Sequence, residues 1–340
     1  MKTFIKVIEI WVPDKDRTQL VLGSGMYGAL YDFKHASEYQ HFAFNEGLPG
    51  KAWAAGHPVV LKKFEHSYFK RTAAAQKAGL TCGIALPIFS GDFLLAVVVF
   101  LCGDDEDHAG AIEVWCSNPN VNSALHVMDG YYGTLKNFEN SSRQLKMAKG
   151  KGIPGMAWET GMPVLIEDIT KVGEFARVAD AQRDGITTGL GIPAGICGEQ
   201  AYVMTFLSAK ATPIAKRIQI WIPDPHGKKL VCQQGHSKSS NDLAEMFESI
   251  TIEKGIGALG RVWLTGMPVI TGSQDETYYN PELDNLSSML AIPVIRHGRL
   301  KAIAVKYCAT AFSAFSTSLY FGDVVETQDF ASLQAFKSRT

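Results

Sequence analysis

The chain has 340 residues, of which 46% are hydrophobic and 20% charged, the balance of a soluble globular protein with room for two or three domains. Its formal net charge of −1 removes the usual electrostatic case for binding nucleic acid or an anionic membrane surface. The longest apolar run, residues 93–102, is about half as long as a membrane span requires.

The N-terminus and the cysteines both favour a cytoplasmic protein. Residues 1–4 lead straight into a strand-like segment, without the apolar core or cleavage site of a signal peptide. The six cysteines form no CxxC pair, and most lie inside apolar strand patterns, which is typical of small buried residues. We therefore expect neither a membrane nor a nucleic acid as a partner.

One motif occurs three times and organises the sequence. The pattern Gly-x-x-Gly-x-x-Trp, followed by Gly-x-Pro-Val, begins at Gly47, Gly152 and Gly257, and its tryptophans lie 105 residues apart each time. A period this long predicts three small domains rather than a solenoid, whose repeats are about 20–50 residues long. We place the repeats at residues 1–105, 106–211 and 212–340.

Each repeat is predicted to open with a β-hairpin. Its first strand alternates β-branched residues and ends in tryptophan, at residues 8–11, 112–115 and 218–221. Turn residues and a second strand follow, at residues 19–22, 123–128 and 229–233. A polar stretch then leads to the glycine motif, which predicts a turn, a short helix around its tryptophan and a glycine stop before a Pro-Val strand.

The segment after the motif is predicted to be a helix in repeats 1 and 2. Residues 69–79 and 175–185 share Phe, Arg, two Ala, Gln and a terminal Gly that suits a helix C-terminus. Repeat 3 lacks the arginine here and is shorter. Each repeat then closes with two strands, the second apolar on both faces, as in a covered sheet centre: residues 83–88 and 93–100, 189–196 and 201–207, 289–295 and 300–307.

This order of elements resembles a GAF domain, repeated three times. The match spans residues 5–307 and is good in repeats 1 and 2 and partial in repeat 3. The sequences of residues 83–89 and 218–223 are also similar to the GAF-like module of plant NIN-like transcription factors. The resemblance implies six-stranded antiparallel sheets, with a small-molecule pocket between each sheet and its helices.

The expected fold class is α+β, with three repeated antiparallel sheets that carry short helices mainly on one face. The junctions at residues 103–111 and 209–217 leave no room for the terminal helices that cover the back of the sheet in GAF domains. Since an apolar face is costly to leave in water, we expect the three sheets to cover one another in a pseudo-threefold arrangement. Residues 318–322 resemble a further opening strand that completes the third sheet.

Arg71 and Arg177 are the predicted ligand contacts, because a guanidinium presents a planar fork of donors that suits carboxylate or phosphate. The resemblance places their helices beside the pocket. The residues predicted to accompany them are Phe69, Gln76, Phe175 and Gln182. The alternative for both arginines is a solvated or ion-paired helix face.

No catalytic or metal-binding constellation is recognisable. The GxGxxG patterns at residues 150–155 and 255–260 lack the long helix of a dinucleotide site, because Gly161 and Gly266 stop the helix within two turns. The histidines have no metal-ligand spacing, and no cysteine stands beside a histidine as a bilin attachment would require. Cys82 and Cys116 are the pair available to a thiol-dependent methionine sulfoxide reductase, the weakest alternative.

The sequence therefore predicts a non-enzymatic regulatory protein that senses a small molecule and passes the signal to a partner protein. No kinase, cyclase, phosphodiesterase or DNA-binding segment is recognisable as an output. The competing hypothesis is a structural or interaction scaffold whose GAF-like units have lost their ligand. The sequence names neither the ligand nor a cofactor.

Overall fold

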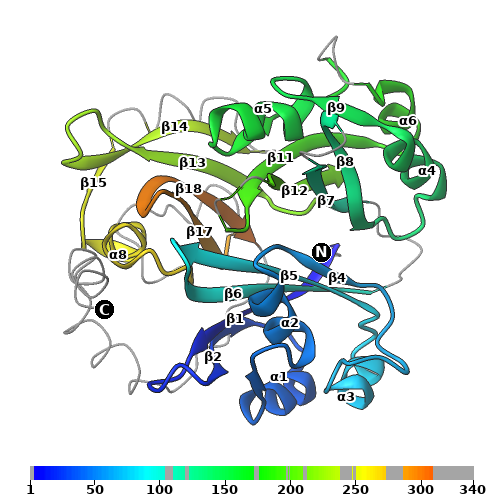
Figure 1. The fold of residues 1–340 in the computed structure, drawn as a ribbon, viewed down its shortest axis with the longest axis vertical. Helices are drawn as coiled ribbons and strands as arrows, with labels where there is room; N and C mark the ends of the chain where they lie inside the picture. The colour runs from blue at the N-terminus through cyan, green and yellow to red at the C-terminus, as the bar shows by residue number, and fades with distance from the viewer. Residues whose placement is uncertain are drawn as a thin grey trace.

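The computed structural model describes residues 4–103, 110–118, 122–171, 176–196, 198, 200–209, 213–237, 247, 250–272 and 286–308, without the side chains of residues 122 and 123. Three antiparallel sheets, one from each repeat, lie around a common centre, and the helices lie at the periphery (Figure 1). The α+β class and the threefold repetition predicted from the sequence are confirmed.

The elements of repeat 1 follow the predicted order. They are β1 (Ile5–Pro13), β2 (Gln19–Met26), α1 (Tyr31–Glu38), β3 (His41–Ala43), α2 (Gly47–Ala55), β4 (Val59–Leu61), α3 (Thr72–Lys77), β5 (Cys82–Ser90) and β6 (Phe93–Cys102).

The helices and strands described in repeats 2 and 3 follow the same order. Repeat 2 has β7 (Gly110–Asn118), β8 (Asn122–Tyr131), α4 (Lys136–Gln144), β9 (Lys146–Ala148), α5 (Gly152–Thr160), β10 (Val164–Ile166), α6 (Val178–Arg183), β11 (Ile186–Ala194) and β12 (Tyr202–Ala209). Repeat 3 has β13 (Arg217–Pro223), β14 (Lys229–Ser237), β15 (Thr251–Glu253), α8 (Gly257–Thr265), β16 (Val269–Gly272), β17 (Ser288–Arg296) and β18 (Arg299–Cys308).

All three sheets have one topology. The strand orders are β3-β2-β1-β6-β5-β4, β9-β8-β7-β12-β11-β10 and β15-β14-β13-β18-β17-β16. The first and last strands of each repeat pair at the sheet centre, which explains why most of their residues are buried. In the described part of the chain each sheet takes its strands from one repeat. The domain boundaries themselves remain a prediction.

The glycine motif forms the helix on the outer face of each sheet. The second glycine of the motif, Gly50, Gly155 or Gly260, packs so tightly that a Cβ there would come within 3.0 Å of a carbonyl oxygen in the preceding strand segment. Each helix ends at a glycine in the left-handed conformation, with φ between 66° and 70° at Gly56, Gly161 and Gly266. The glycines therefore fix helix position and helix end.

The tryptophans of a repeat differ in burial. The strand tryptophans Trp11, Trp115 and Trp221 are at most 1% exposed. The motif tryptophans Trp53, Trp158 and Trp263 pack against the core but stay partly exposed. Residues such as Leu48 and Ala52 point inward from the helix instead.

The inner faces of the sheets share one hydrophobic core. It joins residues such as Ile84 and Phe100 of repeat 1 to Phe206 of repeat 2 and to Ile218 and Ile292 of repeat 3. The rings of Phe100 and Phe206 meet edge to face, with centroids 5.2 Å apart. The sheets therefore cover one another, where a lone GAF-like unit would need terminal helices.

Hydrogen bonds and an ion pair join the repeats to one another. At the joint of repeats 1 and 2, Ile196 donates its backbone N–H to the Gly56 carbonyl (2.8 Å), and Lys62 pairs with Asp129 (2.8 Å). At the joint of repeats 2 and 3, Gln234 donates to the carbonyl of Leu165 (3.1 Å).

The joint of repeats 3 and 1 brings Ser288 of β17 to the sulfur of Met26 in β2 (3.4 Å). Because the third repeat returns to the first, the three sheets form a closed ring. Two segments lie outside the described residues. They are the predicted strand at residues 318–322 and residues 278–283 of repeat 3, which stand where repeats 1 and 2 have the arginine helix.

Candidate functional site

In repeat 1 a buried ion pair fills the space between the sheet and its helices. Glu9 comes from the middle of β1 and is 0% exposed, and Arg71, at the start of α3, is 4% exposed. The guanidinium donates to both carboxylate oxygens. Its Nη2 lies 2.9 Å from Oε2, and its Nη1 donates to Oε1. Such bidentate pairing is the strongest geometry available to arginine.

Further groups complete the pair in repeat 1. The Trp11 indole and the Tyr27 hydroxyl donate to the two carboxylate oxygens, each at 2.9 Å. The Ser37 hydroxyl accepts from Arg71 and lies within donating distance of two acceptors, Oε1 of Glu9 (2.9 Å) and the Phe33 carbonyl (2.8 Å). The charged groups are thus hydrogen-bonded on several sides, as burial of charge requires.

Aromatic rings enclose the guanidinium of Arg71. Its Cζ lies 4.7 Å from the ring centroid of Phe33, 5.2 Å from that of Phe69 and 5.3 Å from that of Trp11. Aromatic faces attract a guanidinium, more strongly where water is excluded. Repeat 1 therefore provides arginine with both a counter-ion and a cage.

Repeat 2 builds the same arrangement. Arg177, 5% exposed, binds Glu113, which is 0% exposed, with Nη2 3.2 Å from Oε2. The Trp115 indole donates to Glu113 at 2.9 Å, and Arg177 also donates to the Ser142 hydroxyl. One partner is new, since the Thr205 hydroxyl donates to Glu113 at 3.0 Å.

Repeat 3 has a different set of polar groups at this place. The residue equivalent to Glu9 is Gln219, whose side-chain oxygen accepts from Trp221 (3.1 Å) and Tyr307 (3.0 Å). Its buried arginine, Arg217, comes from the strand itself and stacks on the rings of Phe247 and Tyr307, 5.7 and 5.5 Å from their centroids. The carboxylate and the helix arginine are absent together.

Both glutamates are held ionised. Burial raises the pKa of Glu9, but the charge and hydrogen bonds of Arg71, with those of Ser37 and Trp11, outweigh it and hold the pKa below its ordinary value. Glu113 is lowered in the same way, against its own burial, by Arg177, Ser142 and Trp115. Each guanidinium therefore faces a full negative charge of the protein.

The predicted site residues divide into two groups. Arg71 and Phe69 meet in the interior of repeat 1, where the Phe69 ring also stacks on Phe64 with centroids 3.8 Å apart. Gln76 and Gln182 are exposed, and Gln76 donates to Glu65 (2.6 Å). Phe175 lies outside the described residues.

Glu9 and Glu113 are the site residues that the sequence reasoning missed. Each stands between β-branched residues on a strand predicted to be buried, an unusual place for a carboxylate. The repeats carry a second clue, because Glu and Arg occur together in repeats 1 and 2, and repeat 3 loses both. That paired change indicates direct contact.

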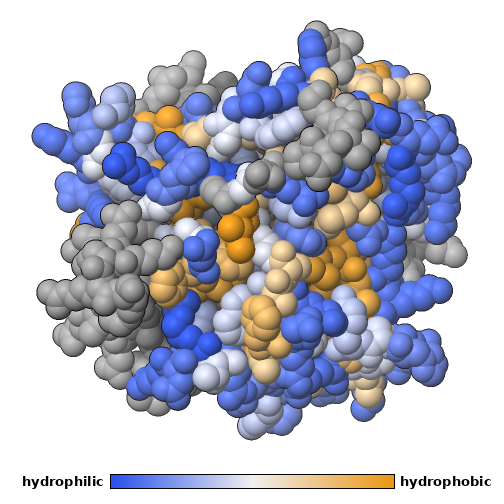
Figure 2. Space-filling model, viewed as in Figure 1, coloured by the Kyte–Doolittle hydropathy of each residue, from blue (hydrophilic) through white to orange (hydrophobic). Residues whose placement is uncertain are grey.

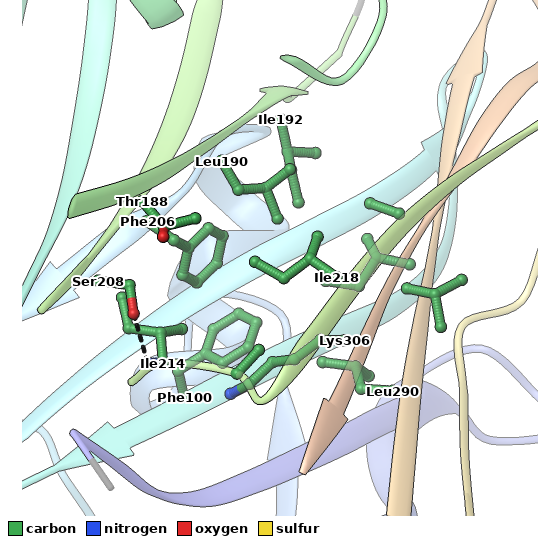
Figure 3. A pocket seen from close by; sticks show the side chains of 14 residues that line it. Phe100, Thr188, Leu190, Ile192, Phe206, Ser208, Ile214, Ile218, Leu290 and Lys306 are labelled. Carbon is green, nitrogen blue, oxygen red and sulfur yellow. Dashed lines mark hydrogen bonds between the residues drawn. The ribbon is translucent and has the colours of Figure 1, made fainter. Parts of the chain in front are cut away.

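Two cavities lie between the sheets rather than between sheet and helices. One is bordered by strands of all three repeats, and the other is lined by the strand segments around Pro87, Pro193 and Pro293. In the view of Figure 2 hydrophobic residues gather toward the centre of the molecule, where the repeats meet. The first cavity is shown in Figure 3.

Thiol and metal chemistry find little support in the described residues. Burial raises the pKa of the Cys116 thiol and raises that of Cys232 to about 11, which opposes nucleophilic thiolate chemistry. Cys82 and Cys116 belong to different sheets. The described part contains no cluster of three or more His, Cys, Asp or Glu side chains that could hold a metal ion.

Six antiparallel strands in this order, with short helices on the outer face and a polar network between them, are found in each repeat. Each repeat has a GAF-like fold. Among the described residues, no helix has the length and apolar content needed to cross a membrane.

Solved structures similar to this chain include GAF domains, while no protein-family model and no curated protein matches it. The nlh2 GAF domain of A. aeolicus is 21% identical, with a TM-score of 0.24, and the match covers 29% of this chain and 58% of that one. The GAF domain of a Coxiella burnetii phosphoenolpyruvate-protein phosphotransferase is 19% identical, with a TM-score of 0.25, over 37% and 75%.

A free methionine-R-sulfoxide reductase from Neisseria meningitidis is 19% identical, with a TM-score of 0.23, and the match covers 29% of this chain and 52% of that one. The chain thus spans about half the length of this reductase. Each of these matches extends over roughly the length of one GAF-like repeat.

Proposed function

We propose that this chain is a non-enzymatic regulatory scaffold of three GAF-like repeats that acts by binding a partner protein. The observation that carries the proposal is the occupation of the Arg71 and Arg177 guanidinium forks by Glu9 and Glu113. An anionic ligand would have to displace a buried carboxylate. Leaving one charge of a buried pair uncompensated costs about 3–5 kcal/mol, which works against ligand entry.

An exposed aromatic ridge on repeat 1 provides a surface for the partner. Tyr31 and His35 of α1 and Tyr39 at its end follow one another at intervals of four, so they share one helix face. Tyr31 is 69% and Tyr39 71% exposed, while Phe33 and Ser37 of the same helix point inward. Exposed aromatic groups of this kind mark interaction sites.

The equivalent helix of repeat 2 supports this assignment. α4 buries Phe138 and Ser142 as α1 buries Phe33 and Ser37, yet the positions that match the ridge are polar and exposed: Lys136, Asn140 and Gln144. Folding therefore does not require aromatic residues there. The ridge belongs to repeat 1 alone in the described residues, as a docking surface would.

The charges beside the ridge define the partner's chemistry. Asp32 and Glu38 flank it on either side, and Glu38 lies 3.9 Å from the Lys34 amine and 3.6 Å from the ring of His35 in the ridge itself. A helix ridge of this shape fits a groove on another protein, by the helix-in-groove mode. We infer a partner with an apolar groove that is rimmed by Lys or Arg.

The ridge is tested by exchanging it for its counterpart. The variant Tyr31→Lys, His35→Asn, Tyr39→Gln carries the residues of α4, and we expect its thermal stability to match the wild type. A photocrosslinker at position 35 should label a partner, and one at position 140 should not. With the photocrosslinker kept at position 35, the exchanges Tyr31→Lys and Tyr39→Gln should abolish the labelling. Equal labelling in the exchanged protein, or ridge-dependent dimers in sedimentation, would contradict the proposed partner.

A second candidate is a small-molecule sensor in which an anion replaces the carboxylate at Arg71. It is favoured by one atom, the buried Nε of Arg71, which has no hydrogen-bond partner among the described residues. Thermal-shift screening with nitrate, phosphate, amino acids and nucleotides separates the candidates. If the chain is a scaffold, no compound should raise the melting temperature through Glu9 and Arg71. If it is a sensor, at least one compound should raise the melting temperature of the wild type but not that of Glu9→Gln/Arg71→Met, a variant that has the glutamine of repeat 3 and lacks the helix arginine.

A further inference from the structure

The cavity of Figure 3 lies where the inner faces of the three sheets meet. Strands β6, β11, β12, β13, β17 and β18 contribute residues to its walls, so all three repeats border it. Every residue that lines it is buried, with at most 9% of its surface exposed. The cavity volume is about 20 Å³, space for roughly one water-sized molecule.

The closing strand of repeat 3 fills its share of this centre less completely than the closing strands of the other repeats. In the sheet register one inner position is Val98 in repeat 1, Met204 in repeat 2 and Ala304 in repeat 3. The position two residues later carries a phenyl ring in repeats 1 and 2 and is Lys306 in repeat 3. Ala304 and Lys306 both line the cavity. Smaller or thinner side chains at equivalent places in a close-packed interior leave a void.

The polar groups of the lining residues have partners elsewhere. The Ser208 hydroxyl oxygen accepts a backbone N–H (2.9 Å), and the Thr188 hydroxyl donates to the Glu167 carbonyl (3.1 Å). The Lys306 amine is hydrogen-bonded to the Cys308 thiol. The surface of the cavity is almost wholly apolar. Because a buried water needs two to four polar partners, a cavity with this surface stays dry.

The remaining walls determine what can enter. Phe100 and Phe206 lie together on the cavity wall, with ring centroids 5.2 Å apart, and Leu190, Ile218 and Leu290 are among the aliphatic residues around them (Figure 3). These groups provide dispersion contacts and no hydrogen bonds, so they favour an apolar ligand over water or an ion. The volume excludes molecules much larger than water.

We propose that this cavity binds one apolar diatomic gas molecule of the size of dioxygen. The ligand contacts side chains of all three repeats and restores dispersion contacts that the void leaves unmade. Binding therefore favours the closed ring of sheets. This site is independent of the proposed partner function and of the ion pairs in repeats 1 and 2.

The test uses dioxygen, which is paramagnetic and speeds the relaxation of nearby protons. In the full chain under oxygen pressure, we expect the methyl protons of Leu190, Ile218 and Leu290 to gain several-fold more relaxation than those of Leu20. Leu20 is the matched reference, because it is 0% exposed and lies in the helix-side core of repeat 1. In Ala304→Met, which introduces the residue of repeat 2, the gain at the cavity methyl groups should fall to that of Leu20.

Two results would overturn the site. One is an equal gain at the cavity methyl groups and at Leu20 in the wild type, and the other is an undiminished gain in Ala304→Met. If Ala304→Met does not fold, Lys306→Phe takes its place, since it restores the ring that the other two repeats carry, and it should lower the gain in the same way. If neither variant folds, the comparison with Leu20 in the wild type decides between binding and no binding.

Discussion

At the scale of single residues, Glu9 and Arg71 determine the interior of repeat 1. The carboxylate is fully buried and the guanidinium nearly so, and each finds its charge partner in the other. In repeat 3 the same position is a glutamine bound to Trp221 and Tyr307. The comparison shows that this strand position accepts either a glutamate paired with the helix arginine or a glutamine held by Trp221 and Tyr307.

Breaking the pair should cost more than removing it. We expect Arg71→Met to lower the free energy of unfolding by about 3–5 kcal/mol, because it leaves the buried Glu9 carboxylate without its counter-ion. Glu9→Gln/Arg71→Met should lose much less. Urea denaturation of the two single variants and the double variant measures the coupling, and additive losses would show that the two side chains do not act as a pair.

The same pair predicts a response to acid. Because the folded pKa of Glu9 lies below its ordinary value of 4.5, the carboxylate contributes stability above that value, and this contribution is lost as the pH falls through the folded pKa. Glu9→Gln should therefore lose less stability than the wild type between about pH 5 and pH 2. Parallel curves for the two proteins in pH-dependent urea denaturation would refute this.

At the scale of secondary structure, the sequence predicts where elements lie better than it predicts what they bury. Strand alternation and the glycine stops place the hairpins and the α2-type helices correctly, since these patterns are local. The inward direction of Arg71 is not local, because it depends on Glu9, 62 residues earlier in the chain. A helix that presents arginine to the core has the same sequence as one that presents it to water.

The second glycine of the motif should tolerate no side chain. In Gly155→Ala the new Cβ would meet the carbonyl oxygen of Ala148, which belongs to backbone that cannot move freely. We expect a loss of about 1–3 kcal/mol, as for overpacking of a core. Gly198→Ala is the matched control, since nothing lies within 4 Å of its Cβ. Equal melting temperatures for the two variants would show that the motif glycine is not sterically required.

At the scale of the whole molecule, the repeats depend on one another for burial. The absence of room for terminal helices allowed the sequence to predict that the sheets cover one another. The way in which the ring closes, through joints such as Gly56 with Ile196 and Met26 with Ser288, could not be predicted, because these contacts join residues from different repeats.

A shared core predicts cooperative unfolding. The inner faces of all three sheets contribute to one cluster of buried residues, so unfolding one repeat exposes the others. Differential scanning calorimetry should show one transition, with equal calorimetric and van't Hoff enthalpies. Three separate transitions would indicate that the repeats are independent domains.

The central claim is that Glu9 occupies, as part of the protein itself, the place that a ligand would take at Arg71. In Glu9→Ala that place is vacated, so acetate should raise the melting temperature of Glu9→Ala well above any effect on the wild type at equal ionic strength. Glu9→Ala/Arg71→Met should show no such gain. An equal acetate response in Glu9→Ala and the wild type would contradict the claim.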